Sequence, residues 1–106
     1  MNHSLHQLLS ALRDGLKSLY GQRLQGVYLY GSYARNEATS ESDVDVLIVL
    51  DTIRSYGEEV QHTSHLIASL SLEHGVSISR VFVSHDAWAT HTSPFLANVQ
   101  EEAVPV

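Results

Sequence analysis

The chain has 106 residues, no cysteine and a formal net charge of −6 with histidine counted as neutral. This length is typical of one domain with a single core, and the lack of cysteine excludes disulfides, zinc–thiolate sites and thiol chemistry. The acidic balance argues against stable binding of a long nucleic acid, because such binding depends on basic groups that replace condensed counterions.

No apolar run approaches the ~20 residues of a membrane span. The opening residues, MNHSLHQLLSAL, lack a basic segment followed by an apolar block, so we expect no signal peptide. We therefore expect a cytoplasmic protein.

The first half of the chain predicts a helix and then two strands. A helix that ends near Gly21 is indicated by leucines at three- and four-residue spacing: Leu5, Leu8, Leu9, Leu12, Leu16 and Leu19. Residues 27–30 predict a short strand, and residues 32–36 predict one helical turn. Residues 44–50 are apolar on both faces, which is typical of a central strand covered on both sides.

The second half predicts a long helix and a third strand. From about residue 53 to residue 74 the pattern is helical, with Asp51 and Thr52 as caps and Gly75 as a stop. Residues 76–83 read as a strand.

The last part of the chain predicts two short helices and an edge strand. Ser84 caps the first helix, and Ser93 followed by Pro94 begins the second. The final residues, AVPV, predict an edge strand in which Pro105 is tolerated. Three aromatic side chains are expected in the core rather than as stacking platforms for bases: Tyr56, Trp88 and Phe95.

The order of these elements predicts one α/β (α+β) domain over residues 1–106. The second and third strands flank a helix and should be parallel, whereas the first and second are joined more closely and should be antiparallel. We expect a small mixed β-sheet of three to four strands with helices packed on it.

Two acids stand at the start of the strongest strand. Side chains two apart on a strand share a face, so Asp43 and Asp45 project together, roughly 6–7 Å apart at Cα. Carboxylates this close repel unless a cation or proton lies between them, and Mg²⁺ prefers such oxygen ligands. Taken alone, the pair fits two solvated acids equally well.

A glycine and a serine end the preceding strand. Gly31 allows close approach of the backbone to a phosphate, and Ser32 offers a hydroxyl together with N–H groups that favour anions. Alone, this pair is an ordinary strand end with a cap. Together with the two aspartates on a neighbouring strand, it predicts a phosphate site beside a metal site.

Gly31-Ser32, ten residues and Asp43-Val44-Asp45 reproduce the G-S-x10-D-x-D signature of the DNA polymerase β-like nucleotidyltransferase superfamily. The chain resembles in particular the minimal nucleotidyltransferases, with which it shares its length and Arg35. Asn36 stands where glycine is common in that motif. The resemblance is tightest over residues 27–50 and looser over the rest of the chain.

The resemblance implies a nucleotidyltransferase fold and transfer of AMP from ATP to an acceptor hydroxyl, with release of pyrophosphate. Asp43 and Asp45 would be catalytic residues that ligate Mg²⁺. Gly31 and Ser32 would bind the β- and γ-phosphates, and Arg35 would steady the triphosphate.

Such proteins are often paired with a small helical HEPN protein, as antitoxin to a ribonuclease toxin, and modify a tyrosine of that partner. The resemblance therefore implies a HEPN-type partner, and we expect a homodimer or a hetero-oligomer. The alternative is a protein of weak or no activity that retains the fold and neutralises its partner by stoichiometric binding.

The alternative arises because active members commonly carry a third carboxylate on the next core strand. Here that strand, GVSISRVFVS, contains no acid, and Ser77 or Ser79 takes the position. Glu73 and Asp86 flank the strand without facing inward.

Three further polar residues have less specific patterns. Arg80 either faces the pocket or pairs with a surface acid, and the pattern does not choose between these. His62 and His65 lack a third ligand at a diagnostic spacing, so they are expected as exposed helix residues.

Overall fold

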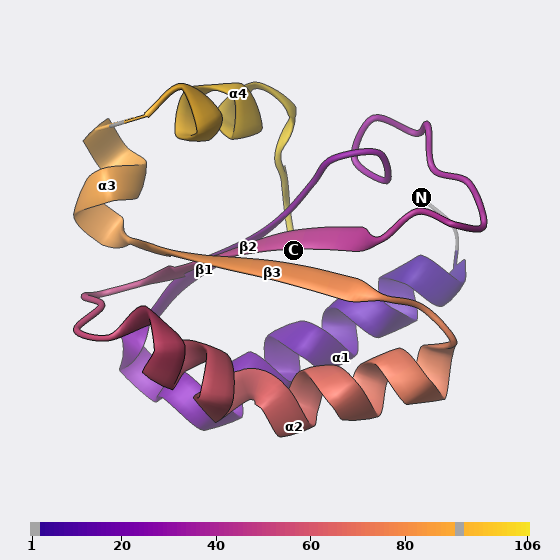
Figure 1. Ribbon diagram of the computed structural model, residues 1–106, viewed down its shortest axis with the longest axis horizontal. Helices are drawn as coiled ribbons and strands as arrows, with labels where there is room; N and C mark the ends of the chain where they lie inside the picture. The colour runs from indigo at the N-terminus through magenta and orange to yellow at the C-terminus, as the bar shows by residue number, and fades with distance from the viewer. Residues whose placement is uncertain (1–2, 91–92) are drawn as a thin grey trace.

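A four-stranded mixed sheet with helices on both faces organises the computed structural model, which describes residues 3–90 and 93–106. The strand order is β3-β2-β1-β4, and Figure 1 shows α1 and α2 on one face, with α3 and α4 on the other. The elements are α1 (His3–Tyr20), η1 (Gly21–Arg23), β1 (Leu24–Tyr30), β2 (Val44–Leu50), α2 (Tyr56–His74), β3 (Ile78–Ser84), α3 (His85–Thr90), α4 (Pro94–Glu102) and β4 (Val104–Pro105).

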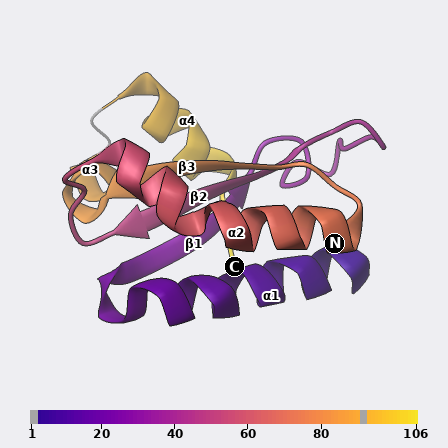
Figure 2. The ribbon, with the colours of Figure 1, turned by 60° about the horizontal axis from the view of Figure 1, so that its bottom comes forward.

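The leucine stripe of α1 faces the sheet as predicted. Five of its six leucines are buried, whereas Leu19 is 37% exposed. The helix lies beside α2, which Figure 2 shows clearly, and the two together cover one face. Gly21, at φ +56°, follows the last helical residue and begins the short 3₁₀ turn.

The first strand is longer than its pattern indicated. It begins at Leu24 rather than at Val27, and its pairing with β2 shifts register between Leu24 and Gly26. Gly26 is a poor strand former, and the irregular pairing interrupts the period of two. These features explain why the sequence pattern missed the first three residues of the strand.

The central strand β2 occupies the predicted residues. It pairs antiparallel with β1 and parallel with β3, as predicted. Val46 and Ile48 pack against the α1 and α2 side, whereas Leu47 and Val49 pack beneath α3 and α4. Helices cover both faces of the sheet, which explains why β2 carries apolar side chains on both sides.

The second helix begins later than predicted, and the predicted caps have another role. Ser55, not Asp51 or Thr52, caps α2, and its hydroxyl accepts a hydrogen bond from Glu58 N–H. Asp51 instead accepts a 3.0 Å hydrogen bond from the Arg23 side chain, which also donates to the Thr52 carbonyl. The long-range arginine contact explains why the local cap pattern misplaced the helix start.

The end of α2 and the third strand agree more closely with prediction. Gly75 ends the helix in the left-handed conformation, at φ +65°. The strand β3 starts two residues later than predicted and runs one residue further, because Val76 and Ser77 form the link from the helix.

The last elements start at the predicted serines. Ser84 accepts a hydrogen bond from Ala87 N–H at the start of α3, and Ser93 accepts one from Leu96 N–H at the start of α4. β4 pairs antiparallel with β1, so the predicted edge strand is confirmed. No described helix is long and apolar enough to cross a membrane.

Two of the three aromatic side chains expected in the core are exposed. Phe95 is 46% exposed and Tyr56 is 47% exposed, so this prediction was wrong for both. Each makes an edge contact with one ring, Tyr30 or Phe82, at the margin of the sheet. The sequence pattern does not distinguish an aromatic residue in the core from one at the surface that contacts a single other ring.

Candidate active site

A tight turn follows β1 and carries the Gly-Ser pair. Gly31 has φ +76°, which side chains disfavour, and its carbonyl accepts a 3.1 Å hydrogen bond from Arg35 N–H. The Ser32 carbonyl accepts a 2.8 Å bond from Glu37 N–H, and Asn36 has φ +60°. The predicted helical turn is present, and the positive φ explains why a glycine would suit position 36.

Several donors of this turn are free. Within the described part of the chain, the N–H groups of Ser32, Tyr33 and Ala34 have no hydrogen-bond partner, and neither does the Ser32 hydroxyl. Successive unpaired N–H groups in a turn favour an anion. The turn therefore offers the donors that a phosphate group requires.

The structure brings the Gly-Ser turn and the two aspartates together. Tyr30, the last residue of β1, is the register partner of Asp45 on β2. A Cβ atom placed on Gly31 would clash with the Asp45 carboxylate and would lie 3.1 Å from its Cγ. Only a glycine leaves room for this approach, so the two halves of the motif are in direct contact.

The aspartates form an uncompensated negative pair. Burial raises the pKa of Asp45, and the nearby Asp43 carboxylate raises it further, whereas the Arg35 cation lowers it. Across residues 3–90 and 93–106, neither carboxylate has a hydrogen-bond or ion-pair partner. A divalent cation would balance this charge, and the two sets of oxygens suit Mg²⁺.

The third carboxylate of the family pattern is absent from the neighbouring strand. The parallel register places Ser79 of β3 beside Asp45, and the Ser77 carbonyl accepts a 2.8 Å bond from Val44 N–H. In the described part of the chain, no group of three or more acidic or histidine side chains is placed to hold a metal. Of the two serines, Ser79 therefore occupies the position beside Asp45.

Sequence reasoning missed one residue at this site, Glu102. Its Oε1 accepts a 3.2 Å hydrogen bond from Gly31 N–H, and its Oε2 accepts a 2.9 Å bond from Arg35 Nη1. Arg35 also lies 3.4 Å from the Glu37 carboxylate. No spacing rule connects the end of the last helix with residue 31, so only the packing of α4 beside β1 reveals this contact.

Tyr30 lies beside Asp45 in the sheet. Burial raises its pKa to about 12, with a further contribution from the Asp45 charge. The phenol therefore stays protonated at neutral pH, which makes it a hydrogen-bond donor rather than a nucleophile.

The residues left open by the sequence lie away from the site. Arg80 donates to the Thr63 hydroxyl and the Val60 carbonyl of α2, so it neither faces the aspartates nor pairs with an acid. His65 is exposed, as expected. The ring of His62 is also exposed at α2 and makes an edge contact with Tyr20.

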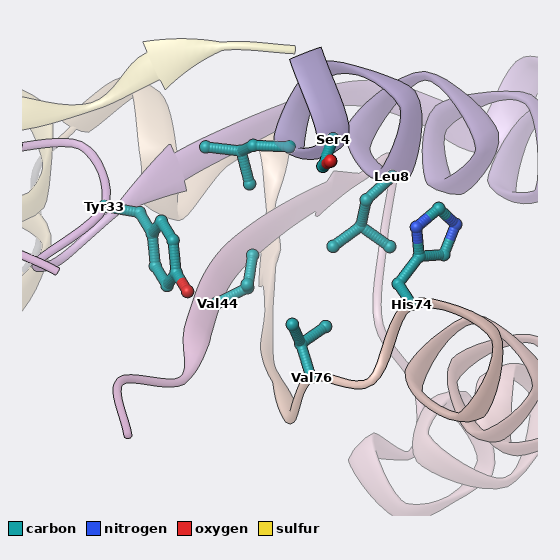
Figure 3. A pocket seen from close by; sticks show the side chains of 7 residues that line it. Ser4, Leu8, Tyr33, Val44, His74 and Val76 are labelled. Carbon is teal, nitrogen blue, oxygen red and sulfur yellow. The ribbon is translucent and has the colours of Figure 1, made fainter. Parts of the chain in front are cut away.

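An apolar cavity lies on the other side of the motif. It has a volume of about 120 Å³ and lies between the start of α1 and the end of α2. In Figure 3, Tyr33 from the turn, Val44 from β2 and the neighbouring Val76 face it, opposite Leu8 of α1. Tyr33 therefore connects the turn after β1 to the core, and Val44 connects the start of β2 to it.

A more polar depression opens beside Asp43. It lies between the loop before β2 and the end of α2, and its lining includes Ser42, Ser71 and Ser77. This depression gives solvent and a ligand direct access to the Asp43 side of the site.

Comparison with known proteins agrees with the signature. Residues 9–84 match the family described as the nucleotidyltransferase domain. A Methanocaldococcus jannaschii protein described as a candidate protein adenylyltransferase, MJ0604, is 36% identical over 90 residues, which is 84% of each chain.

Solved structures share the fold. A candidate minimal nucleotidyltransferase is 27% identical with a TM-score of 0.55, and 94% of each chain is covered. A toxin–antitoxin structure with AMP-PNP has a TM-score of 0.58 at 17% identity, and the match covers 98% of this chain and 72% of that one. The family match spans most of the residues that build the sheet and both halves of the signature, and the chain therefore belongs to the nucleotidyltransferase domain family.

Proposed function

We propose that this nucleotidyltransferase transfers AMP from ATP to a hydroxyl group of a partner protein. The observation that carries the proposal is the contact between Gly31 and Asp45, which joins a turn suited to phosphate with a carboxylate pair suited to Mg²⁺. Such a joint site fits a metal-bound nucleoside triphosphate.

The phosphate end of the site is formed by the turn after β1. The free N–H groups and hydroxyl at Ser32 would bind the β- and γ-phosphates, and Arg35 supplies the nearest positive charge. Gly31 keeps the backbone open at this point because it has no side chain.

The metal end of the site is formed by Asp43 and Asp45. A bound Mg²⁺ stabilises charge on the phosphoryl oxygens during displacement. The two carboxylates would hold the ion, and its charge would offset the repulsion that raises the pKa of Asp45.

The chain places no carboxylate at the position that commonly accepts the proton of the attacking hydroxyl. Ser79 lies there instead, so the proton would pass to a base on the acceptor protein or to solvent. This requirement favours an acceptor that brings part of the catalytic site with it.

The acceptor is proposed to be a toxin protein of the HEPN type, modified on a tyrosine, with the chain as its cytoplasmic antitoxin. Two findings support this: the similar protein described as a candidate protein adenylyltransferase and the fold shared with a toxin–antitoxin structure. The net charge of −6 also suits a protein acceptor better than a nucleic acid. A hetero-oligomer with this partner is more consistent with the proposal than a homodimer alone.

The test uses the purified protein, Mg²⁺, the product of the neighbouring gene, and ATP labelled on either the α- or the γ-phosphate. Label from the α-phosphate alone should appear on the partner. Asp45→Asn should reduce it by at least about 100-fold, since a metal ligand is lost, and Asp86→Asn, a matched change on α3, should leave it unchanged. A stable complex without label would replace this proposal with stoichiometric neutralisation.

A further inference from the structure

The carboxylate of Glu102 occupies the Arg35 side chain, which the proposed function assigns to phosphate, and the Gly31 N–H next to the free donors of the turn. One oxygen accepts from Gly31 N–H at 3.2 Å and the other from Arg35 Nη1 at 2.9 Å. The side chain is 25% exposed, so it lies against the turn rather than in open solvent. A carboxylate and a phosphate oxygen use the same kind of donor, and they cannot share these two at once.

The position of Glu102 is set by the main chain on both sides. Ala103 N–H donates to the Val99 carbonyl at the end of α4, and Val104 then pairs with Leu29 of β1. The backbone at Glu102 is therefore fixed, and the carboxylate leaves the turn by rotation of its own side chain.

The electrostatic surroundings favour that rotation when another anion arrives. Asp45 lies close enough to Glu102 for the glutamate charge to contribute to its raised pKa. The Arg35 hydrogen bond is the main cause of the lowered pKa of Glu102. A polyphosphate that reached Arg35 would remove this partner and add further negative charge beside the glutamate.

We propose that Glu102 is a selectivity residue that competes inside the molecule with the β- and γ-phosphates for Gly31 and Arg35. The inference rests on the proposed function. A triphosphate or pyrophosphate that extends from the free donors at Ser32 to Gly31 and Arg35 displaces Glu102 from them, whereas AMP has no β- or γ-phosphate to compete for them. After transfer, return of Glu102 to the same donors aids release of pyrophosphate.

The experiment measures binding of ATP, inorganic pyrophosphate and AMP, each with Mg²⁺, by calorimetry. Glu102→Gln keeps the shape of the side chain and removes its charge, and Glu101→Gln is the matched control, because Glu101 is exposed and has no described partner. Glu102→Gln should bind ATP and pyrophosphate about tenfold more tightly and AMP with unchanged affinity. Glu101→Gln should behave as the unaltered protein.

Three outcomes overturn the inference. Weaker ATP binding by Glu102→Gln would mean that Glu102 holds Arg35 in place for the nucleotide. Unchanged binding of ATP and pyrophosphate, with Asp45→Asn still abolishing ATP binding, would remove Glu102 from the site and leave the proposed function intact. If the unaltered protein binds neither ATP nor pyrophosphate, the proposed function itself fails.

A second measurement needs no substitution and therefore does not depend on folding of a variant. In the unaltered protein labelled with ¹³C and ¹⁵N, saturating pyrophosphate with Mg²⁺ should shift the Glu102 Cδ and Gly31 amide signals, and AMP should shift neither. An unmoved Glu102 signal at saturating pyrophosphate would contradict displacement.

Discussion

The contact between Gly31 and Asp45 requires a glycine at position 31 for two reasons. The backbone there has φ +76°, and the Asp45 carboxylate fills the space in which a Cβ would lie. Gly57, in the first turn of α2, has no such restriction, because nothing lies within 4 Å of the corresponding Cβ position. The two glycines therefore form a matched pair for substitution.

Gly31→Ala should lower the free energy of unfolding by about 1–2 kcal/mol, the cost of a left-handed residue with a side chain. It should also weaken binding of ATP with Mg²⁺, because the methyl group pushes Asp45 away from the turn. Gly57→Ala should leave both unchanged or slightly raise stability. Denaturant unfolding and calorimetry give the two quantities, and normal ATP binding by Gly31→Ala would contradict this account.

At the scale of the elements, the parallel register of β2 and β3 decides what lies beside the aspartates. Ser79 is the register partner of Asp45, and Ser77 precedes the strand near the level of Asp43. A carboxylate introduced at 79 would point to the same face as Asp45. The register therefore indicates where a third acid would act.

Ser79→Asp should lower the melting temperature without metal, because a third like charge joins the pair. Mg²⁺ should restore stability and bind about tenfold more tightly than to the unaltered protein, since three carboxylates now converge. Thermal unfolding with and without Mg²⁺ measures both effects. Ser69→Asp, an exposed change on α2, is the control, and equal metal affinities for the two variants would show that an acid at position 79 does not join the aspartate pair.

The start of α2 offers a separate test of the fold. The Ser55 hydroxyl accepts from Glu58 N–H, so Ser55→Ala should cost about 1 kcal/mol of stability. Ser69→Ala, an exposed change later in the same helix, should cost nothing because no described partner is lost. Similar losses in the two variants, measured by denaturant unfolding, would mean that Ser55 is not the cap.

How far the sequence predicts these elements depends on how local their causes are. The helix α1 and the strand β2 follow from leucine spacing and an apolar run, and both were predicted closely. The predicted start of α2 was misplaced because Asp51 accepts a hydrogen bond from Arg23, 28 positions away in sequence, instead of capping the helix. In the site, Gly31 and Asp45 were identified from the signature, whereas Glu102 was missed because 71 residues separate it from Gly31.

At the scale of the whole molecule, ion pairs hold segments that are distant in sequence. Arg23 contacts Asp51 after β2 and the carboxylate of Glu59 on α2, at 3.0 and 2.9 Å. Glu59 is buried and also accepts a hydrogen bond from the Tyr20 hydroxyl of α1. Arg23 and Glu59 together therefore connect α1 and α2 with the end of β2.

These contacts predict a specific acid sensitivity. The Thr52 N–H and the Arg23 side chain lower the pKa of Asp51, so its folded-state pKa lies below its unfolded value. Its stabilising contribution is present above the unfolded pKa and is lost as pH falls through the folded pKa. Asp51→Asn should lower the melting temperature at pH 7 and flatten its decline below pH 4, whereas Glu41→Gln should follow the unaltered curve. Parallel curves for Asp51→Asn and the unaltered protein would contradict the assignment.

The pairing of β4 with β1 has a consequence for the protein in concentrated solution. Val104 pairs with Leu29, and Val106 N–H donates to the Val27 carbonyl, so these residues occupy one open edge of the sheet. An uncovered edge of apolar strand recruits strands from other molecules and promotes aggregation. The residues that bring Glu102 to the turn thus also shield β1, and deleting residues 103–106 would expose the protein to edge-to-edge association as well as altering the candidate active site.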